Sequence, residues 1–232
     1  MLPILRHSLS LGPGDPLETL KRLILVAPFL LLTTFAAKAD TVYVDGSYAF
    51  ANNGYGIPPY GGTLNGNSAS FYCIDFTHDI YGQTGWLATQ TPLGSTGSTL
   101  LQNPVTYQEM AWLVTQMMNP TAMANQTGQS NLQTVEAELQ WTIWSMSGLG
   151  GATNPYTSWT GYFSNQAATN YQTVGGSWEI LTPIAHTGYT ASGSPIGGYY
   201  GQEFLVSAVP EPSSIFLLLG GLMLFAAFAL KK

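Results

Sequence analysis

The stretch FYCIDF at residues 71–76 holds the only cysteine of the 232-residue chain. Its alternating side chains predict a β-strand in which Phe71, Cys73 and Asp75 face one way and the residues between them face the other. A lone cysteine in such a strand is either a small buried hydrophobe or a thiol with a chemical task. The stretch by itself leaves both interpretations open.

A second stretch, LQWTIW at residues 139–144, falls in a predicted helix that ends before Gly148. One face of this helix is apolar and consists of Leu132, Val135, Leu139, Ile143 and Met146. Gln140 lies about 110° from the centre of that face, at about 100° per residue. We therefore expect Gln140 at the border of the buried face, with Trp144 one turn further on the same side.

Together the two stretches resemble the thioester domains of bacterial surface adhesins. Those domains carry an aromatic-Cys-aliphatic motif and, on a later helix, a glutamine usually found as Gln-x-Ala-Ile-Trp. In that family the thiol and the glutamine amide condense with loss of ammonia, and a nucleophile on a target surface opens the resulting thioester. The resemblance covers residues 41–147 and implies Cys73 as the thiol and Gln140 as its acyl partner, with Thr142 where alanine is usual. Gln116 is a weaker competitor because no Ile-Trp follows it.

A thioester needs its partners held in contact and its carbonyl kept from water. Tyr72, Trp141 and Trp144 are expected to supply the apolar screen. The competing interpretation makes Cys73 a core residue and Gln140 an ordinary amide at the edge of a helix.

The residues around Cys73 also suggest two other kinds of site, a metal site and a hydrolase triad. Asp75, His78 and Asp79 have side chains that bind metals, but this spacing after a strand is more typical of a solvated turn. Cys73 with His78 or His186 and an acid would form a hydrolase triad, yet no family signature surrounds them. We therefore expect neither a metal, nor a cofactor, nor a turnover enzyme.

The start of the chain is typical of a signal peptide. Lys21 and Arg22 precede an apolar run, and a small-x-small site ends at Ala39. The run is short for a membrane span and contains Pro28. We expect residues 1–39 to be a leader that forms a signal helix and is cleaved before Asp40.

The other end is similar to the PEP-CTERM sorting tail. Val209, Pro210, Glu211 and Pro212 are followed by an uncharged run at residues 215–230 and then by two lysines. In that family exosortase, a membrane transpeptidase of Gram-negative bacteria that make extracellular polysaccharide, recognises the tail. The resemblance implies that residues 209–232 form a sorting tail with a transmembrane helix. It places the protein in the cell envelope, in the membrane or on the surface of such a bacterium.

The charge pattern of the intervening chain limits its partners. From Asp40 to Pro210, with both residues included, the chain has nine acids and no lysine or arginine. Because such a surface cannot neutralise phosphates, nucleic acid is excluded as a partner. The remaining partners are a surface amine or hydroxyl that opens a thioester, or a polysaccharide. In the alternative function, tyrosine, tryptophan, asparagine and threonine side chains bind glycans without covalent chemistry, or the protein is structural in the polysaccharide matrix.

Periodicity predicts the elements of a single domain at residues 40–208. Strands are expected at 41–50, 71–76, 178–181 and 203–208. Helices are expected from a capping box at Thr106 to residue 119, then at 132–146 and briefly at 158–169. Residues 52–67 are predicted as a loop or hairpin connection, 119–130 as a polar loop, and 82–98 as a loop in which Trp86 is a core anchor. The fold class is α+β, a predominantly β domain, barrel- or sandwich-like, with an inserted helical section.

Overall fold

The computed structural model describes residues 39–78, 82–95, 97–148, 152–175, 177–198 and 201–207. Residues 1–38 of the predicted leader and the whole predicted sorting tail at residues 209–232 lie outside the described residues. Within the described ranges, no helix is long and apolar enough to cross a membrane.

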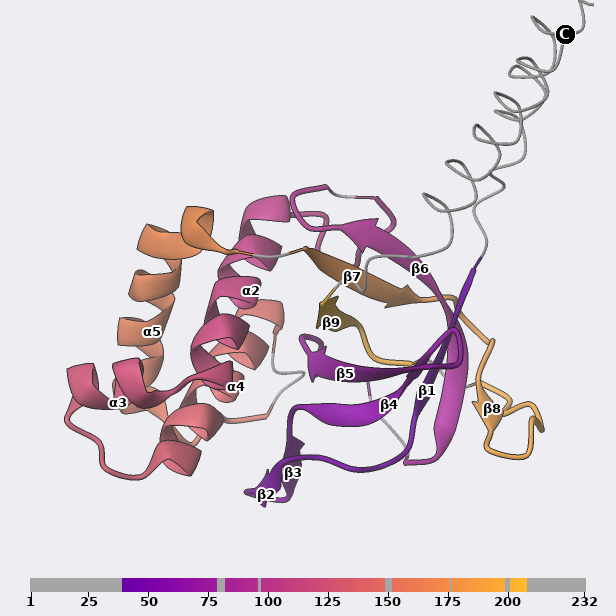
Figure 1. Ribbon diagram of the computed structural model, residues 1–232, viewed down its shortest axis with the longest axis horizontal. Coiled ribbons are helices and arrows are strands. Elements are labelled where there is room, and N and C mark those ends of the chain that lie inside the picture. The colour runs from indigo at the N-terminus through magenta and orange to yellow at the C-terminus, as the bar shows by residue number, and fades with distance from the viewer. Residues whose placement is uncertain are drawn as a thin grey trace, which may run out of the picture. The chain divides into compact units, whose positions relative to one another are not determined.

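Six antiparallel strands close into a barrel (Figure 1). In spatial order they are β1 (Asp40–Val44), β4 (Tyr60–Leu64), β5 (Asn67–Cys73), β9 (Phe204–Ser207), β7 (Trp178–Pro183) and β6 (Thr84–Pro92). The barrel closes because β6 pairs back onto β1, with Trp86 opposite Val42. The short strand β8 (Tyr189–Thr190) extends the sheet beside β6, and β2 (Phe50–Asn52) with β3 (Tyr55–Ile57) forms a separate hairpin.

Aromatic rings fill the barrel around Phe204. Its ring stacks on Trp86 with centroids 5.7 Å apart and contacts Phe71 at 5.6 Å and Tyr60 at 6.1 Å. Rings in such contact add about 0.5–1.5 kcal/mol per pair beyond the area they bury. The chain passes very close to this cluster at Gly201, where an added Cβ would lie 2.7 Å from the Trp86 ring. Glycine is therefore the residue that fits there.

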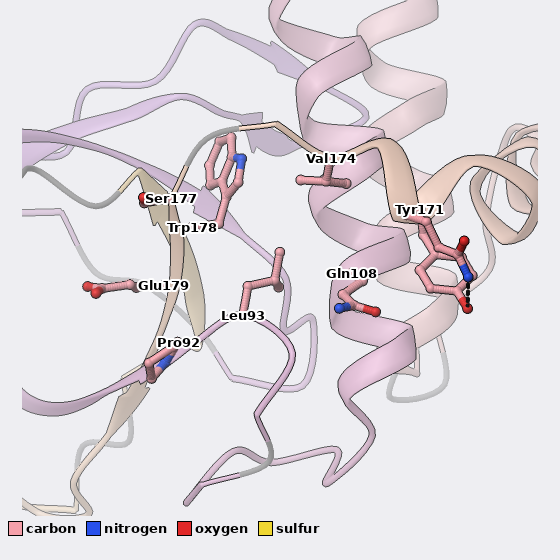
Figure 2. Close-up of a pocket in the computed structure, with 9 residues that line it drawn as sticks. Pro92, Leu93, Gln108, Tyr171, Val174, Ser177, Trp178 and Glu179 are labelled. Atoms are coloured by element: carbon pink, nitrogen blue, oxygen red, sulfur yellow. Dashed lines mark hydrogen bonds between the residues drawn. The ribbon is translucent and has the colours of Figure 1, made fainter.

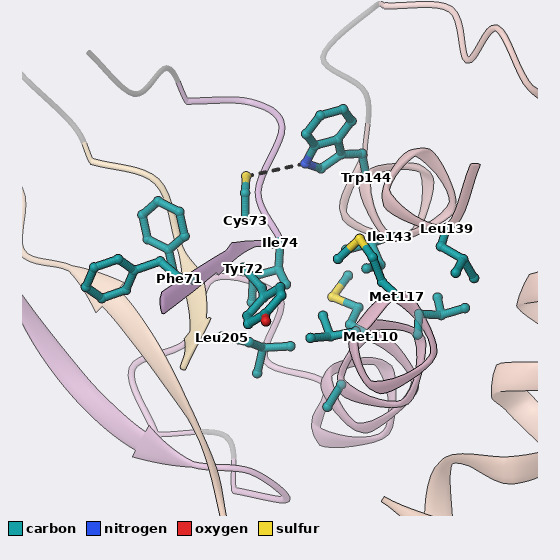
Figure 3. Packing of buried hydrophobic residues seen from close by; sticks show 14 of the residues in the cluster. Phe71, Tyr72, Cys73, Ile74, Met110, Met117, Leu139, Ile143, Trp144 and Leu205 are labelled. Atoms are coloured by element: carbon teal, nitrogen blue, oxygen red, sulfur yellow. Dashed lines mark hydrogen bonds between the residues drawn. The ribbon is translucent and has the colours of Figure 1, made fainter. Parts of the chain in front are cut away.

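The helical section is inserted between β6 and β7. It comprises α2 (Pro104–Met118), α3 (Thr121–Thr127), α4 (Leu132–Ser147), α5 (Thr157–Asn170) and the 3-10 helix η1 (Tyr171–Thr173). Helices α2, α4 and α5 pack against one another, and η1 packs beside α2 (Figure 2). Tyr72 and Leu205, a cross-strand pair on the outer face of the barrel, point toward Met110 and Ile143 of the helices (Figure 3). This interface joins the barrel and the helical section into one core.

Asparagine side chains start the two central helices. Asn103 accepts hydrogen bonds from the backbone N–H groups of Val105 and Thr106, and Pro104 occupies the first turn. Asn131 does the same for the first turn of α4. The predicted capping box at Thr106 is therefore wrong, since proline tolerates the first helical position and asparagine is a strong N-cap.

The α+β class is confirmed, and of the two expected forms the barrel is the one observed. The helices predicted at 132–146 and 158–169 are present as α4 and α5, and Trp86 is fully buried. The loop predicted at 82–98 is wrong, because this segment forms β6, the longest described strand. Its backbone is hydrogen-bonded to three other strands, and such pairing overrides a composition rich in Gly, Thr and Gln.

Four other predicted boundaries differ from the structure. The strand expected at 41–50 is divided into β1 and β2, and the one expected at 71–76 ends at Cys73. The segment 52–67 is partly the expected hairpin, but it also contains the barrel strand β4. The polar loop expected at 119–130 contains the helix α3, whose Met123 and Ala124 are buried. In each case a tertiary contact overrides a local pattern that is weak or ambiguous.

A buried carboxylate ties the barrel to the first helix. Glu203 is 1% exposed, and its oxygens accept hydrogen bonds from Tyr107 Oη and Thr182 Oγ1, each at 2.5 Å, and from the Leu100 backbone N–H at 3.1 Å. Burial raises the pKa of Glu203, whereas these three hydrogen bonds lower it. The carboxylate thus connects β9, β7 and the chain leading into α2.

Replacing Glu203 by glutamine should destabilise the fold. The amide keeps one acceptor oxygen and turns an NH2 group toward groups that are themselves donors. Because an unsatisfied buried polar group costs about 1–3 kcal/mol, we expect the free energy of unfolding to fall by about that amount. Urea unfolding monitored by tryptophan fluorescence measures the change.

The matched control is Glu109→Gln, on α2, where the carboxylate is only partly buried. Its free energy of unfolding should change little. Equal stability of the Glu203→Gln variant and the wild type would contradict the assigned role of the carboxylate.

Candidate functional site

Cys73 is the last residue of β5 and lies where the barrel meets the helices. The residue is 1% exposed. The Trp144 Nε1–H group of α4 donates to its sulfur at 3.3 Å (Figure 3). The thiol in turn lies 3.1 Å from the backbone oxygen of Asp75 and 3.2 Å from Gln202 Oε1, both acceptors. The sulfur is therefore buried and has hydrogen-bonding contacts with three polar groups.

Gln140 meets this strand end from α4. Its Nε2 donates to the backbone oxygen of Cys73 at 2.8 Å, across 67 residues of sequence. Its side chain is fully buried rather than at the border of the buried face, which corrects the prediction. The middle of α4 is enclosed on nearly all sides, so the border that helical periodicity predicts does not exist there. The structure brings Cys73 and Gln140 together as the sequence predicts.

The other atom of the Gln140 amide has no hydrogen-bond partner. Oε1 is buried, and no described residue donates to it. Buried polar groups are nearly always paired, and leaving one unpaired costs about 1–3 kcal/mol. A local rule broken at this cost is typical of a functional site.

Four aromatic rings cover the site. Trp141 and Trp144 of α4, Tyr55 of β3 and Phe76 contact one another in every pairwise combination, with centroids 4.9–6.0 Å apart. Tyr55 is the outermost, at 40% exposure. We call these four rings the aromatic cover.

Half of this aromatic cover is predicted from the sequence. Trp141 and Trp144 are part of it, whereas Tyr72 is not. Tyr72 follows the strand alternation to the other face of β5, where its ring meets Trp178 edge-on at 5.9 Å. Phe76 lies in the stretch 71–76, so its closeness to Cys73 in sequence could have placed it in the cover. Tyr55 lies in a Gly-rich hairpin, and no feature of the sequence links this hairpin to α4.

The surroundings of Cys73 determine its acidity. Burial raises its pKa from the ordinary 9.0 to about 12, and the Trp144 hydrogen bond acts in the opposite direction. The charge of Asp75 makes a smaller contribution that raises the pKa, and the hydrogen bond to the Asp75 backbone makes one that lowers it. At neutral pH the thiol is protonated, which is the state of a shielded group rather than of a hydrolase nucleophile.

The geometry gives little support to the two alternative chemistries, a metal site at Asp75 and His78 and a hydrolase triad with Cys73. Asp75 Oδ2 and His78 Nδ1 are 2.5 Å apart, and Asp75 Oδ1 accepts from the backbone and hydroxyl of Thr77. These contacts make a turn after the strand. Among the described residues, which exclude Asp79, no group of three His, Cys, Asp or Glu side chains is placed to hold a metal. Neither His78 nor His186 is a hydrogen-bond partner of the Cys73 sulfur.

A second amide, Gln202, touches the thiol and was not predicted. Its Oε1 faces the sulfur, and its Nε2 donates to the backbone oxygen of His78. No motif marks this residue, which reaches Cys73 across 129 residues of sequence. The weaker competitor Gln116 makes its side-chain contact with Thr115 on its own helix.

The chain was compared with known proteins at three levels. No protein-family model, no curated protein and no solved structure matches it.

The shielding of the thiol predicts its reactivity. In Gln140→Ala the thiol is free, and at pH 8 a pKa of about 12 leaves about one molecule in ten thousand as thiolate, against about a tenth at the ordinary value. Native alkylation by iodoacetamide should therefore be about a thousandfold slower than alkylation in urea. The raised pKa also stabilises the folded variant below pH 9, and this stabilisation is lost as the pH rises toward 12.

Opening the aromatic cover should weaken this protection. Adding Tyr55→Ala to Gln140→Ala should speed native alkylation at least tenfold, because water and reagent reach the sulfur. Tyr48→Ala is the matched control, since Tyr48 is similarly exposed at 49% and is not part of the cover. Alkylation of the native parent as fast as in urea, or equal effects of the two tyrosine variants, would contradict the assignment.

Proposed function

We propose that this chain is an exported surface protein that attaches covalently to a nucleophile through a thioester between Cys73 and Gln140. One observation carries the proposal: the buried Gln140 amide is bonded to the backbone of Cys73, in a site closed to water. The residue that carries the lone thiol and the residue that carries the amide are thus in contact, although 67 residues of sequence separate them.

The bond forms by condensation. The Cys73 sulfur attacks Cδ of Gln140, the C–N bond breaks, and the thiol proton leaves with the NH2 group as ammonia. Proximity is the main contribution of the protein, because two groups held in contact behave as if at very high concentration. Negative charge develops on Oε1 of Gln140 in this step, and no described residue donates a hydrogen bond to this atom.

A target nucleophile then opens the bond. An amine or hydroxyl attacks the thioester carbonyl, the C–S bond breaks, and the sulfur leaves with the proton of the nucleophile. The product is an amide or ester at Gln140 and a free thiol at Cys73. The Trp144 N–H group, which donates to the sulfur, stabilises the negative charge on it as it leaves. The reaction occurs once, so the protein is not a turnover enzyme.

The rest of the chain is consistent with storing an activated acyl group. The aromatic cover excludes water, which would otherwise hydrolyse the thioester. No lysine lies between Asp40 and Pro210, so no side-chain amine of the domain competes with the target. Lysine-dependent crosslinks within the domain are excluded for the same reason.

Export and sorting form the second part of the proposal. The leader ends at Ala39, and β1 begins at Asp40, the first residue after the proposed cleavage. The tail from Val209 carries Pro-Glu-Pro, an uncharged run and two lysines in the order of a PEP-CTERM signal. The proposed partners are an exosortase-type transpeptidase, the membrane and a surface that presents amines or hydroxyls.

Intact mass spectrometry tests the thioester. The chain, processed or full length, should weigh less than its sequence predicts by one ammonia molecule. Methylamine added under unfolding conditions should produce a methylamide at Gln140 and a thiol that reacts with iodoacetamide. Cys73→Ala and Gln140→Ala should each have the full expected mass and remain inert to methylamine.

Gln202→Ala and Gln116→Ala are the matched controls, because each removes another glutamine amide. Both should retain the loss of ammonia, which would assign the acyl group to Gln140. A wild type with full mass and an alkylatable thiol would overturn the proposal, and loss of the bond only in Gln202→Ala would reassign the partner.

The sorting signal is tested separately. Replacing Pro210, Glu211 and Pro212 by alanine leaves the apolar run of the tail unchanged, so the chain should still insert into the membrane. In a host that has exosortase, its maturation to a shorter form should stop. Identical maturation of the variant and the wild type, followed by immunoblot, would show that the motif does not act as a sorting signal here.

A further inference from the structure

A pocket of about 440 Å³ lies apart from the thiol, where strands β6 and β7 meet α2 and η1 (Figure 2). This volume is in the range of small-ligand sites. The lining residues are Pro92, Leu93, Gln108, Tyr171, Gln172, Val174, Ser177, Trp178 and Glu179.

Leu93, Val174 and Trp178 form the apolar side of this pocket (Figure 2). Trp178 is 6% exposed and is held edge-on against Tyr72. The backbone N–H of Leu93 donates to the Trp178 oxygen at 3.0 Å, which fixes the two residues relative to each other. The apolar side is therefore formed before any ligand arrives.

Uncharged polar groups surround it. The Gln108 amide is half-buried beside Leu93 and has no hydrogen bond to any described residue (Figure 2). The Gln172 Nε2 group donates to Tyr171 Oη at 3.3 Å, which leaves the Gln172 carbonyl oxygen available. Ser177 adds an exposed hydroxyl. The pocket thus offers both donors and acceptors next to an apolar surface.

The charged groups around the pocket limit the charge that a ligand can carry. Its charged lining residue is Glu179, and the domain has no lysine or arginine to balance a phosphate, sulfate or uronate. A peptide adding as a strand is also disfavoured, because β6 and β7 already pair with each other here, with Pro92 opposite Glu179. A neutral ring with one apolar face and several hydroxyls fits both the apolar side and the uncharged polar groups of this pocket.

We propose that this pocket binds a short segment of a neutral polysaccharide. The apolar C–H face of a sugar packs on Leu93, Val174 and Trp178, and its hydroxyls bond to Gln108, Gln172 and Ser177. The site is separate from the thiol and does not depend on the thioester. It makes the domain a non-covalent glycan binder in addition to its proposed covalent role.

Direct binding to the purified full chain tests this inference. The probes are the neutral tetrasaccharides cellotetraose, maltotetraose, mannotetraose and chitotetraose, with tetragalacturonate as the anionic comparison and acetyl-tetra-alanine amide as the peptide comparison. Saturation-transfer NMR and calorimetry should detect binding of at least one neutral tetrasaccharide. Tetragalacturonate and the peptide should not bind.

Three variants assign the binding to the pocket. Gln108→Ala and Gln172→Ala should each weaken binding at least tenfold, and alanine at Gln108 also favours its helix. Gln133→Ala, an exposed glutamine on α4 outside the pocket, should bind as the wild type does. Cys73→Ala should also bind normally, which separates this site from the thioester.

Several results would overturn the inference. They are no binding of any neutral probe, preferential binding of tetragalacturonate or of the peptide, and neutral binding that survives both glutamine variants in the pocket. Loss of binding in Cys73→Ala would instead attribute it to the thiol site and would equally refute the inference.

Discussion

The contact between the end of β5 and the middle of α4 is the interaction on which the rest of the structure depends. The Gln140 amide donates to the Cys73 backbone and the Trp144 indole donates to the Cys73 sulfur, so one strand end and one helix are held together at two points. Both hydrogen bonds are buried and therefore strong relative to any competing water. The barrel and the helical section meet here, and the proposed chemistry needs both.

The junction between β5 and α4 contains buried polar atoms without hydrogen-bond partners, and these lower the stability of the fold. Gln140 Oε1 and Trp141 Nε1 are buried without partners among the described residues, at about 1–3 kcal/mol for each such group. Close by, Glu203 shows the opposite arrangement, since three donors satisfy its buried carboxylate. A fold that pairs its structural carboxylate so completely is able to satisfy buried groups. The unpaired Gln140 oxygen supports the proposal that this amide takes part in chemistry.

The two proposals place two kinds of binding on one small domain. The thiol site is closed, covered by aromatic rings and suited to a reaction that occurs once. The pocket beside η1 is lined by uncharged polar groups and suited to reversible contact with sugars. Trp178 of β7, in the pocket wall, contacts Tyr72, which precedes Cys73 on β5, so the pocket is connected to the strand that carries the thiol. Reversible binding of a polysaccharide would keep the domain close to a surface on which the covalent step takes place.

The sequence by itself determined the α+β class, the helices α4 and α5 and the lack of basic side chains between Asp40 and Pro210, because periodicity, residue type and charge are local properties. It also predicted that Cys73 and Gln140 lie together, and the Gln140 amide does contact the Cys73 backbone. The tertiary structure alone decided that β6 is a strand, that Gln140 is fully buried, and that Tyr55 and Gln202 join the site. The physical reason is that strand pairing and ring contacts link residues far apart in the chain. β6 is held by three partner strands and Gln202 reaches Cys73 across 129 residues, neither of which leaves a local pattern.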